Sequence, residues 1–370
     1  MRREPTELER RLIERIRREG AITFRAFMQS ALYDPELGYY KTERPKIGAQ
    51  GDYYTSSNVH PAFGCLLARA FAELCAGSDE PLTIVEMGAG TGQLAYDVLS
   101  GLRDEHPAAF ERLAYVLVEA SPAMRALQQA KLNGFKDHIR WCELEELERS
   151  PVSGTVFSNE FVDALPVHRV RYVSGALEEL YVEAGPNTDE ASLALVWSKA
   201  STEKLTQYVE RIGVTLRQSQ ILEINLDMID WLARIARALR QGFLITIDYG
   251  DTAQHLCAQD RESGTLRSFY RHRLIDSPLE RIGEQDITAS VNFTALIEHG
   301  RDFGFETVSY ERQAAFLIRM GLIERVVDGG SLRSPGDWKD RLALKNLFVP
   351  GGVSENFRVL IQKKSHAAAL

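Results

Sequence analysis

Residues 81–98 contain the pattern that most limits how this chain can fold. An apolar run at positions 82–85 is followed by an acid and three alternating glycines: Glu86, Gly88, Gly90 and Gly92. Apolar residues at helical spacing come next, so the order predicts a strand, a sharp turn and a helix. Glycine suits such a turn because it tolerates backbone angles that a Cβ disfavours and lets a ligand approach bare backbone. The free N–H groups at the start of the helix would face that ligand.

The spacing of the glycines separates two kinds of nucleotide site. The dinucleotide fingerprint G-x-G-x-x-G requires glycine or alanine where this chain has Gln93, which disfavours an NAD-dependent oxidoreductase. The pattern E-x-G-x-G-x-G instead resembles the first motif of S-adenosylmethionine (SAM)-dependent methyltransferases. That resemblance implies that Glu86 and the glycines contact the cofactor. The alternative is a purely structural turn.

Two later strands add candidate contacts for an adenosyl group. The run 115–118 ends on Glu119, and a carboxylate at this point of a doubly wound sheet can accept hydrogen bonds from both ribose hydroxyls. The alternative is a surface glutamate that caps the helix beginning near Ser121. The next strand, 138–142, makes Trp141 and Cys142 candidate neighbours of the adenine, although a tryptophan there more often belongs to the core.

Polar residues follow the fourth predicted strand, 154–158. Asn159, Glu160 and Asp163 come where the carboxyl ends of strands one and four flank the ligand crevice of such a sheet. Amide and carboxylate groups can orient an amine or guanidinium and hold its charge. We therefore predict that these three residues are catalytic. Helix capping by Asn159 or Asp163 is the alternative.

The N-terminal 80 residues are expected to form a helical cap and an active-site loop. Thr23 is placed as the N-cap of a helix that reaches Leu32. The polar, tyrosine-containing segment 51–61 includes Thr55 and Ser56, which either face the cofactor or form an ordinary capped loop.

The rest of the chain continues an α/β pattern with insertions. Alternating segments at 167–173 and 177–182 predict a hairpin, and 242–250 predicts the fifth strand. A polar segment follows at 251–290. Helices are expected near 204–212, 226–239, 293–303, 314–327 and 337–347, with strands at 306–310 and 356–363.

Composition excludes several classes of protein. The 370 residues are 44% hydrophobic and 26% charged, which is normal for a globular protein. A net charge of −8 argues against a nucleic-acid-binding protein. The four cysteines lie far apart and suggest neither a metal site nor a disulfide framework. Residues 1–20 are dense in both Arg and Glu, lack the apolar core of a signal peptide, and contain acids that disfavour a transit peptide. Together with the lack of a run of roughly 18 apolar residues, this predicts a soluble, cytoplasmic protein without a membrane span.

Four segments in order resemble the MidA family of SAM-dependent methyltransferases: 51–56, 86–92, 159–166 and 286–293. This family includes the mitochondrial complex I assembly factor regarded as a protein arginine methyltransferase. The resemblance implies a seven-stranded, Rossmann-like class I methyltransferase sheet at 81–370, with insertions at about 167–225 and 251–290 after strands four and five. It also implies that SAM is the cofactor. The expected partner is a protein, for example a respiratory complex subunit, and a homodimer is one expected assembly.

The chain departs from the usual family pattern at a few positions. Ala89 and Thr91 replace a proline and an arginine in the glycine loop, and Val162 stands where relatives commonly carry an aromatic residue. SAM binding depends on the glycines, which are kept, whereas target recognition is affected. The leading hypothesis is methyl transfer to a protein side-chain nitrogen, most directly arginine. The alternative is a SAM-binding assembly factor or chaperone with little turnover.

Overall fold

The computed structural model describes residues 4–42, 60–76, 81–185, 192–327, 344–345, 347 and 353–365. These residues belong to two compact units. The first unit takes its residues from Met1–Tyr53, Asp163–Trp231 and Asp251–His299. The second takes Tyr54–Val162, Leu232–Gly250 and Gly300–Leu370. The N-terminal segment therefore groups with both predicted insertions, while the helix that starts at Ala62 groups with the glycine turn.

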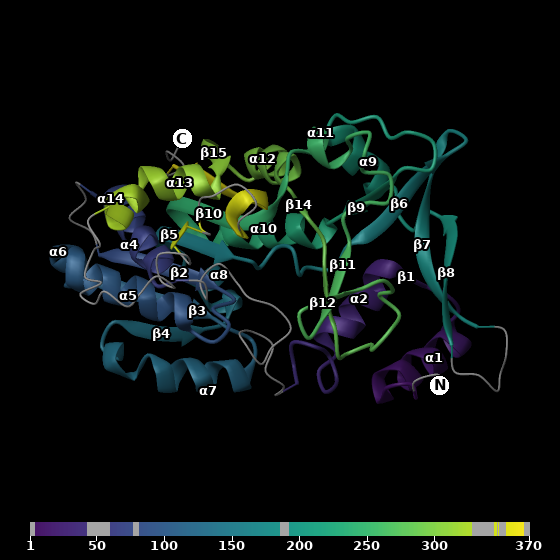
Figure 1. Ribbon diagram of the computed structural model, residues 1–370, viewed down its shortest axis with the longest axis horizontal. Coiled ribbons are helices and arrows are strands. Elements are labelled where there is room, and N and C mark those ends of the chain that lie inside the picture. Colours follow the sequence, from purple (N-terminus) through teal and green to yellow (C-terminus); the bar gives the residue numbers. More distant parts are fainter. Residues whose placement is uncertain are drawn as a thin grey trace. The chain divides into compact units, whose positions relative to one another are not determined.

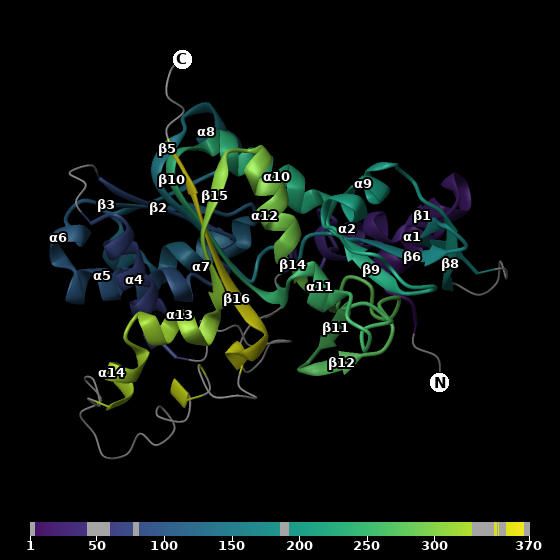
Figure 2. The same cartoon turned by 90° about the horizontal axis from the view of Figure 1, so that it is seen from above.

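A mixed sheet forms the centre of the second unit. In sheet order its main path is β15 (Phe305–Arg312), β16 (Phe357–Lys364), β10 (Leu239–Asp251), β5 (Val152–Asn159), β2 (Leu82–Met87), β3 (Leu113–Val118) and β4 (Ile139–Cys142). Neighbouring strands from β10 to β4 are parallel, whereas β16 is antiparallel to both β10 and β15. Figure 2 shows β16 in yellow, running between those two neighbours. The prediction of an α/β fold around a central sheet is confirmed.

Helices alternate with these strands along the chain. They are α4 (Ala62–Leu74), α5 (Gln93–Glu105), α6 (Pro107–Phe110), α7 (Pro122–Lys131), α8 (Leu144–Arg149), α10 (Leu226–Ala238), α12 (Phe293–Asp302), α13 (Gln313–Arg319) and α14 (Leu322–Val327), with short 3-10 turns at Asn133–Phe135 and Val353–Asn356. Buried residues of α4, α5 and α13 share one apolar core with β2, β3 and β16. Two glycines bring α4 and α5 close together, since a Cβ on Gly64 would lie 2.4 Å from Cβ of Asp97 and one on Gly101 would lie 2.9 Å from Cα of Cys65.

The first unit is built around antiparallel sheets. One contains β1 (Ile22–Thr23), β7 (Ala176–Ala184), β6 (His168–Val173) and β9 (Ile221–Ile224), with β8 (Leu193–Lys199) paired to β7. A smaller sheet contains β12 (Arg273–Ile275), β11 (Arg267–Tyr270) and β13 (Asp286–Thr288). The short strand β14 (Val291–Asn292) is not part of this smaller sheet. The helices are α1 (Glu7–Glu19), α2 (Phe24–Tyr33), α9 (Lys204–Arg211) and α11 (Ala253–Leu256). Figure 1 labels these elements, apart from β13.

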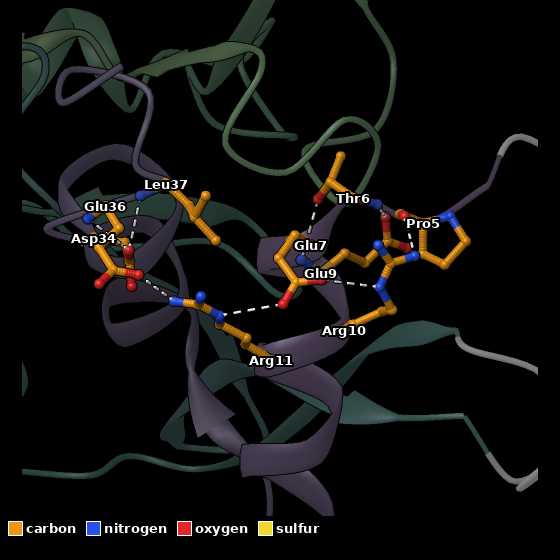
Figure 3. Close-up of polar contacts among 9 residues, drawn as sticks. All are labelled: Pro5, Thr6, Glu7, Glu9, Arg10, Arg11, Asp34, Glu36 and Leu37. Atoms are coloured by element: carbon orange, nitrogen blue, oxygen red, sulfur yellow. Dashed lines mark hydrogen bonds and ion pairs between the residues drawn. The ribbon is translucent and has the colours of Figure 1, made fainter.

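The N-terminal helices are fixed by caps and by an apolar core. Thr6 and Glu9 form a capping box at α1: the Thr6 hydroxyl accepts from the N–H of Glu9 at 3.1 Å, and the Glu9 carboxylate accepts from the N–H of Thr6 at 3.3 Å. Figure 3 shows this cap together with the ion pair between Arg11 and Glu36. The Thr23 hydroxyl accepts from the N–H of Ala26 at 3.1 Å, so its predicted role as the α2 N-cap is confirmed.

Most local predictions match the structure, but several short strands were missed. The predicted hairpin is β6 and β7, whose residues pair from Val170↔Glu179 to Val173↔Ala176. The strands that were not predicted are β1, β8, β9, β11, β12, β13 and β14. Most of the helix expected near 337–347 lies outside the described residues. None of the helices in the described parts of the chain combines the length and apolar character that a bilayer crossing demands.

Candidate active site

The glycine turn joins β2 to α5 in the second unit. Gly88, Gly90 and Gly92 have φ angles of 66°, 53° and 76°, and Gly92 is the left-handed N-cap residue of α5. The predicted strand, turn and helix are therefore confirmed. No side chain caps α5 within the described chain, so its first N–H groups are available to a polar ligand.

The first glycine makes room for a protein side chain. A Cβ on Gly88 would lie 2.7 Å from Cδ2 of Phe161, closer than real Cβ contacts. Phe161 follows β5 and belongs to the segment that carries the predicted catalytic residues. The ring of Phe161 thus packs on the glycine turn, and it holds the segment after β5 beside that turn.

Glu86 lies at the carboxyl end of β2 and is only 2% exposed. Its Oε2 accepts a hydrogen bond of 2.6 Å from the hydroxyl of Tyr115 on the neighbouring strand. Burial, together with the charge of Glu119, raises the pKa of Glu86 to about 7 against the opposing effect of the Tyr115 hydrogen bond. A direct contact of Glu86 with the cofactor remains a prediction.

Glu119 follows β3, and both of its carboxylate oxygens accept hydrogen bonds. Oε1 accepts from the N–H of Ser121 at 2.8 Å, and Oε2 accepts from Nε2 of Gln128 at 3.1 Å. A carboxylate has about four acceptor positions in all. The cap of α7 comes from Ser121, whose hydroxyl accepts from the N–H of Met124 at 3.4 Å. Glu119 therefore supports the start of α7, and its contact with the ribose of the cofactor stays a prediction.

Trp141 and Cys142 end β4. The indole N–H of Trp141 donates to Oε1 of Gln128 at 2.9 Å, while the rest of the half-buried ring packs against the core. Cys142 is 3% exposed, and burial raises its pKa. Both interpretations of Trp141, core residue and adenine neighbour, are compatible with this placement.

The predicted catalytic segment starts at the end of β5. Nδ2 of Asn159 donates to Oε1 of Glu160 at 3.3 Å. Glu160 has a φ of 51°, which is unusual for a residue other than glycine and is often found at functional sites. Its N–H donates to the carbonyl of Ile247 on β10 at 2.9 Å. The end of β5 thus presents an amide and a carboxylate from a constrained backbone.

Asp248, on β10, fixes the residues that follow Glu160. Its Oδ2 accepts from the N–H groups of Phe161 and Val162 at 3.2 and 3.0 Å, and its Oδ1 accepts from the N–H of Tyr249 at 2.9 Å. The Asp248 side chain is fully buried. Such charge-assisted bonds to backbone N–H groups hold a loop firmly.

The third predicted catalytic residue belongs to the other unit, because the chain changes unit between Val162 and Asp163. Asp163 is 5% exposed, and its carbonyl accepts from the N–H of Ala289 at 3.1 Å. Burial, together with the nearby charges of Asp163 and Asp286, raises the pKa of Tyr33 well above its usual value. The predicted cofactor ligands Thr55 and Ser56 lie outside the described residues.

Sequence reasoning missed Gln128 and Asp248. A glutamine in an amphipathic helix looks like part of the solvated face, and its only unusual signal is its position on the buried side of α7. An aspartate near the end of an apolar strand, such as Asp248, could have been found from the same rule that selected Glu119.

Two features of these residues fit an adenosyl cofactor. The glycine turn presents bare backbone, and α5 presents N–H groups without a side-chain cap. These groups would hold SAM, which supplies an activated methyl group when it is bound.

Comparisons with known proteins agree with this site. Residues 66–310 match the family model described as S-adenosyl-L-methionine-dependent methyltransferase. A crystal structure of a Burkholderia thailandensis protein, described as a methyl transferase and bound to S-adenosyl-homocysteine, is 27% identical to this chain. Its TM-score is 0.87, and the match covers 98% of this chain and 93% of that one.

Two curated relatives are mitochondrial proteins by name. The Drosophila melanogaster protein arginine methyltransferase NDUFAF7 homolog is 29% identical, over 79% of this chain and 69% of the relative. The Danio rerio protein arginine methyltransferase NDUFAF7 is 27% identical, and the match covers 85% of this chain and 76% of the relative. These names contradict the cytoplasmic location expected from the sequence, which rested only on the absence of recognisable targeting features. The expected family and cofactor are confirmed: the chain belongs to the S-adenosyl-L-methionine-dependent methyltransferases.

Proposed function

We propose that this methyltransferase acts on a side-chain nitrogen of a protein, most directly the guanidinium of arginine. The curated relatives at 27–29% identity are named protein arginine methyltransferases. The observation that carries the proposal is the placement of Glu160: its carboxylate follows β5, its backbone is fixed in a left-handed conformation, and the next residue packs on the glycine turn.

The chemistry required of the protein is mainly positioning, because the transferred methyl group is already activated. Glu160 binds the guanidinium in a planar, bidentate manner that lysine cannot copy. Asn159 keeps the Glu160 carboxylate oriented through its amide. Asp163, three residues along the chain, supplies a second negative charge. The nitrogen–carbon bond forms as the methyl–sulfur bond breaks, and the proton lost from nitrogen passes to a carboxylate or to water.

The same proposal extends to the organisation of the chain. The path from β15 to β4 has the strand count of the seven-stranded methyltransferase sheet, with the segments 167–225 and 251–290 inserted into it. We infer that these insertions and the N-terminal cap serve substrate recognition, which is supported by their grouping in one compact unit. A protein substrate agrees with the relatives' names. A respiratory complex subunit as that substrate, and a homodimer, are predictions from the family resemblance alone.

Methyl transfer from labelled SAM into proteins of a mitochondrial or bacterial lysate tests the proposal, followed by analysis of the modified amino acid. Methylarginine should appear in acid hydrolysates. The Glu160→Gln variant should lose transfer roughly tenfold to hundredfold, since one charge-assisted contact of about 1.5–3 kcal/mol is removed. Its affinity for SAM should stay close to wild type, because the cofactor is bound by other residues.

The matched control is Glu111→Gln, which changes an exposed glutamate of the same unit. If Glu160→Gln and Asp163→Asn both transfer methyl at the wild-type rate, the two carboxylates are structural. If wild-type protein binds SAM but labels nothing, the assembly-factor hypothesis replaces the catalytic one.

A further inference from the structure

Gln128 is the buried residue of α7, and none of its surface is exposed. A buried side-chain amide has two donors and an acceptor to satisfy, and each unsatisfied group costs free energy. A buried glutamine therefore destabilises the fold relative to an apolar residue unless its polar groups are hydrogen-bonded. Its presence in the core indicates a role for those hydrogen bonds.

The hydrogen bonds of Gln128 connect the ends of three adjacent strands. Its Nε2 donates to the carbonyl of Gly90 at 2.8 Å and to Oε2 of Glu119 at 3.1 Å. Its Oε1 accepts from Nε1 of Trp141 at 2.9 Å. The carbonyl and the carboxylate can only accept and the indole N–H can only donate, so the amide has one permitted orientation.

The stem of Gln128 also lies under the glycine turn. A Cβ on Gly92 would be 3.2 Å from Cγ of Gln128, so the left-handed backbone at Gly92 rests on this side chain. One residue thus contacts the turn at two glycines and fixes one oxygen of Glu119. The N–H of Ser121 fixes the other oxygen. Because both oxygens accept hydrogen bonds, the plane of the Glu119 carboxylate is set.

We propose that Gln128 is a positioning residue of the adenosyl site, and that it makes the site selective for a cofactor carrying a complete ribose diol. The reason is geometric: a bidentate contact with vicinal hydroxyls requires a carboxylate held in one plane, and Gln128 holds Glu119 in that plane. This inference deepens the proposed cofactor site and rests on the assignment of Glu119 to the ribose.

Binding titrations with S-adenosylhomocysteine and its 2′-deoxy analogue test the inference. Wild-type protein should bind the complete ribose about tenfold or more tightly, the value of one hydrogen bond to a charged group. Gln128→Met keeps the length and volume of the side chain but removes all its hydrogen bonds. In this variant the preference should fall to about twofold or less, because a carboxylate free to rotate no longer separates the two ligands.

Gln129→Met is the matched control, because Gln129 is the next residue of the same helix and is exposed. It should keep the wild-type preference. Trp141→Phe provides a second variant that removes only the donor to Oε1, and it too should weaken the preference while the aromatic ring stays. Circular dichroism identifies any variant that fails to fold.

The possible results distinguish an error in the role of Gln128 from an error in the assignment of Glu119 to the ribose. A folded Gln128→Met protein that still prefers the complete ribose as strongly as wild type overturns the role of Gln128 alone. If wild-type protein binds both ligands equally, the assignment of Glu119 to the ribose is wrong, and the inference fails with it. If neither ligand binds, the proposed adenosyl site itself is wrong.

Discussion

Two carboxyl groups of the second unit are buried at positions where ionisation is unfavourable. Glu86 is 2% exposed and Asp97 is 4% exposed. Burial raises the pKa of Glu86 to about 7 and that of Asp97 to about 6, although each accepts a hydrogen bond that opposes the shift. Both values exceed the ordinary range near 4, so the folded state binds more protons than the unfolded state. The protonated forms of Glu86 and Asp97 therefore contribute to the free energy of unfolding. This contribution is fully present below about pH 4 and is lost as the pH rises through 6 and 7.

Replacing Asp97 by Asn should stabilise the protein at pH 8. The variant removes a buried charge but keeps the oxygen that accepts from Nε2 of Gln93 at 3.0 Å. A shift of about two pKa units corresponds to roughly 2–3 kcal/mol, so a gain of about 1–3 kcal/mol in the free energy of unfolding is expected at pH 8. Little or no gain is expected at pH 4. Urea denaturation at both pH values measures the difference.

Asp104→Asn is the control on the same helix, because Asp104 is exposed and pairs with Arg103. Its effect should be small at either pH, as for most exposed ion pairs. Equal stabilisation by Asp97→Asn at pH 4 and pH 8 would show that ionisation of Asp97 is not the cause.

At the scale of elements, the turn after β2 and the segment after β5 depend on each other. Gly88→Ala would place a Cβ against the ring of Phe161, at a φ angle that already disfavours a side chain. We expect a loss of about 1–3 kcal/mol in the free energy of unfolding, in the range of an overpacked contact. Cofactor affinity should fall as well, because the turn shifts.

A double-mutant cycle separates the two causes. Phe161→Leu shortens the ring that Gly88 accommodates, so the Gly88→Ala penalty should shrink in that background by about 0.5 kcal/mol or more. The backbone part of the penalty should remain. An unchanged penalty in the Phe161→Leu background would contradict a direct contact between the two residues.

The sequence predicts those helices, strands and turns whose formation depends on residues close together in the chain. The strand, turn and helix at 82–105 and the Thr23 cap could be predicted because glycine spacing and capping act within a few residues. Strand β9 has only four residues, and among the described residues β8 pairs only with β7. Their strand conformation depends on partners that are distant in sequence. Gln128 was missed for the same reason, since its importance lies in contacts made across the fold. Asp248 differs, because its position near the end of an apolar strand is a local signal.

At the scale of the whole molecule, the two units have separate apolar cores. Phe27 is fully buried among residues of α1, α2, β7 and the segment near Ile287 in the first unit. Phe63 is fully buried among residues of α4, α5 and β2 in the second. The glycine turn and Glu119 belong to the second unit, so cofactor binding should stabilise that unit in particular.

Phe27→Ala should lower the free energy of unfolding of the first unit by about 3–5 kcal/mol and should split thermal unfolding into two transitions. S-adenosylhomocysteine at about 100 times its Kd should raise only the upper transition, by roughly 2.7 kcal/mol of free energy. In Phe63→Ala the ligand should instead act on the lower transition. Differential scanning calorimetry with and without ligand measures both. A single transition that responds to ligand in both variants would mean that the units unfold together.

The position of β16 has a consequence for synthesis of the protein. This strand comes far after β10 and β15 in the chain, yet it pairs with both of them. While a ribosome is translating the region between Arg312 and Phe357, the two neighbours already exist and each has an open edge towards the missing strand. Open edges can recruit strands from other nascent chains. We therefore expect that these edges need protection until residue 364 has emerged, and that a chain truncated before Phe357 aggregates rather than folds.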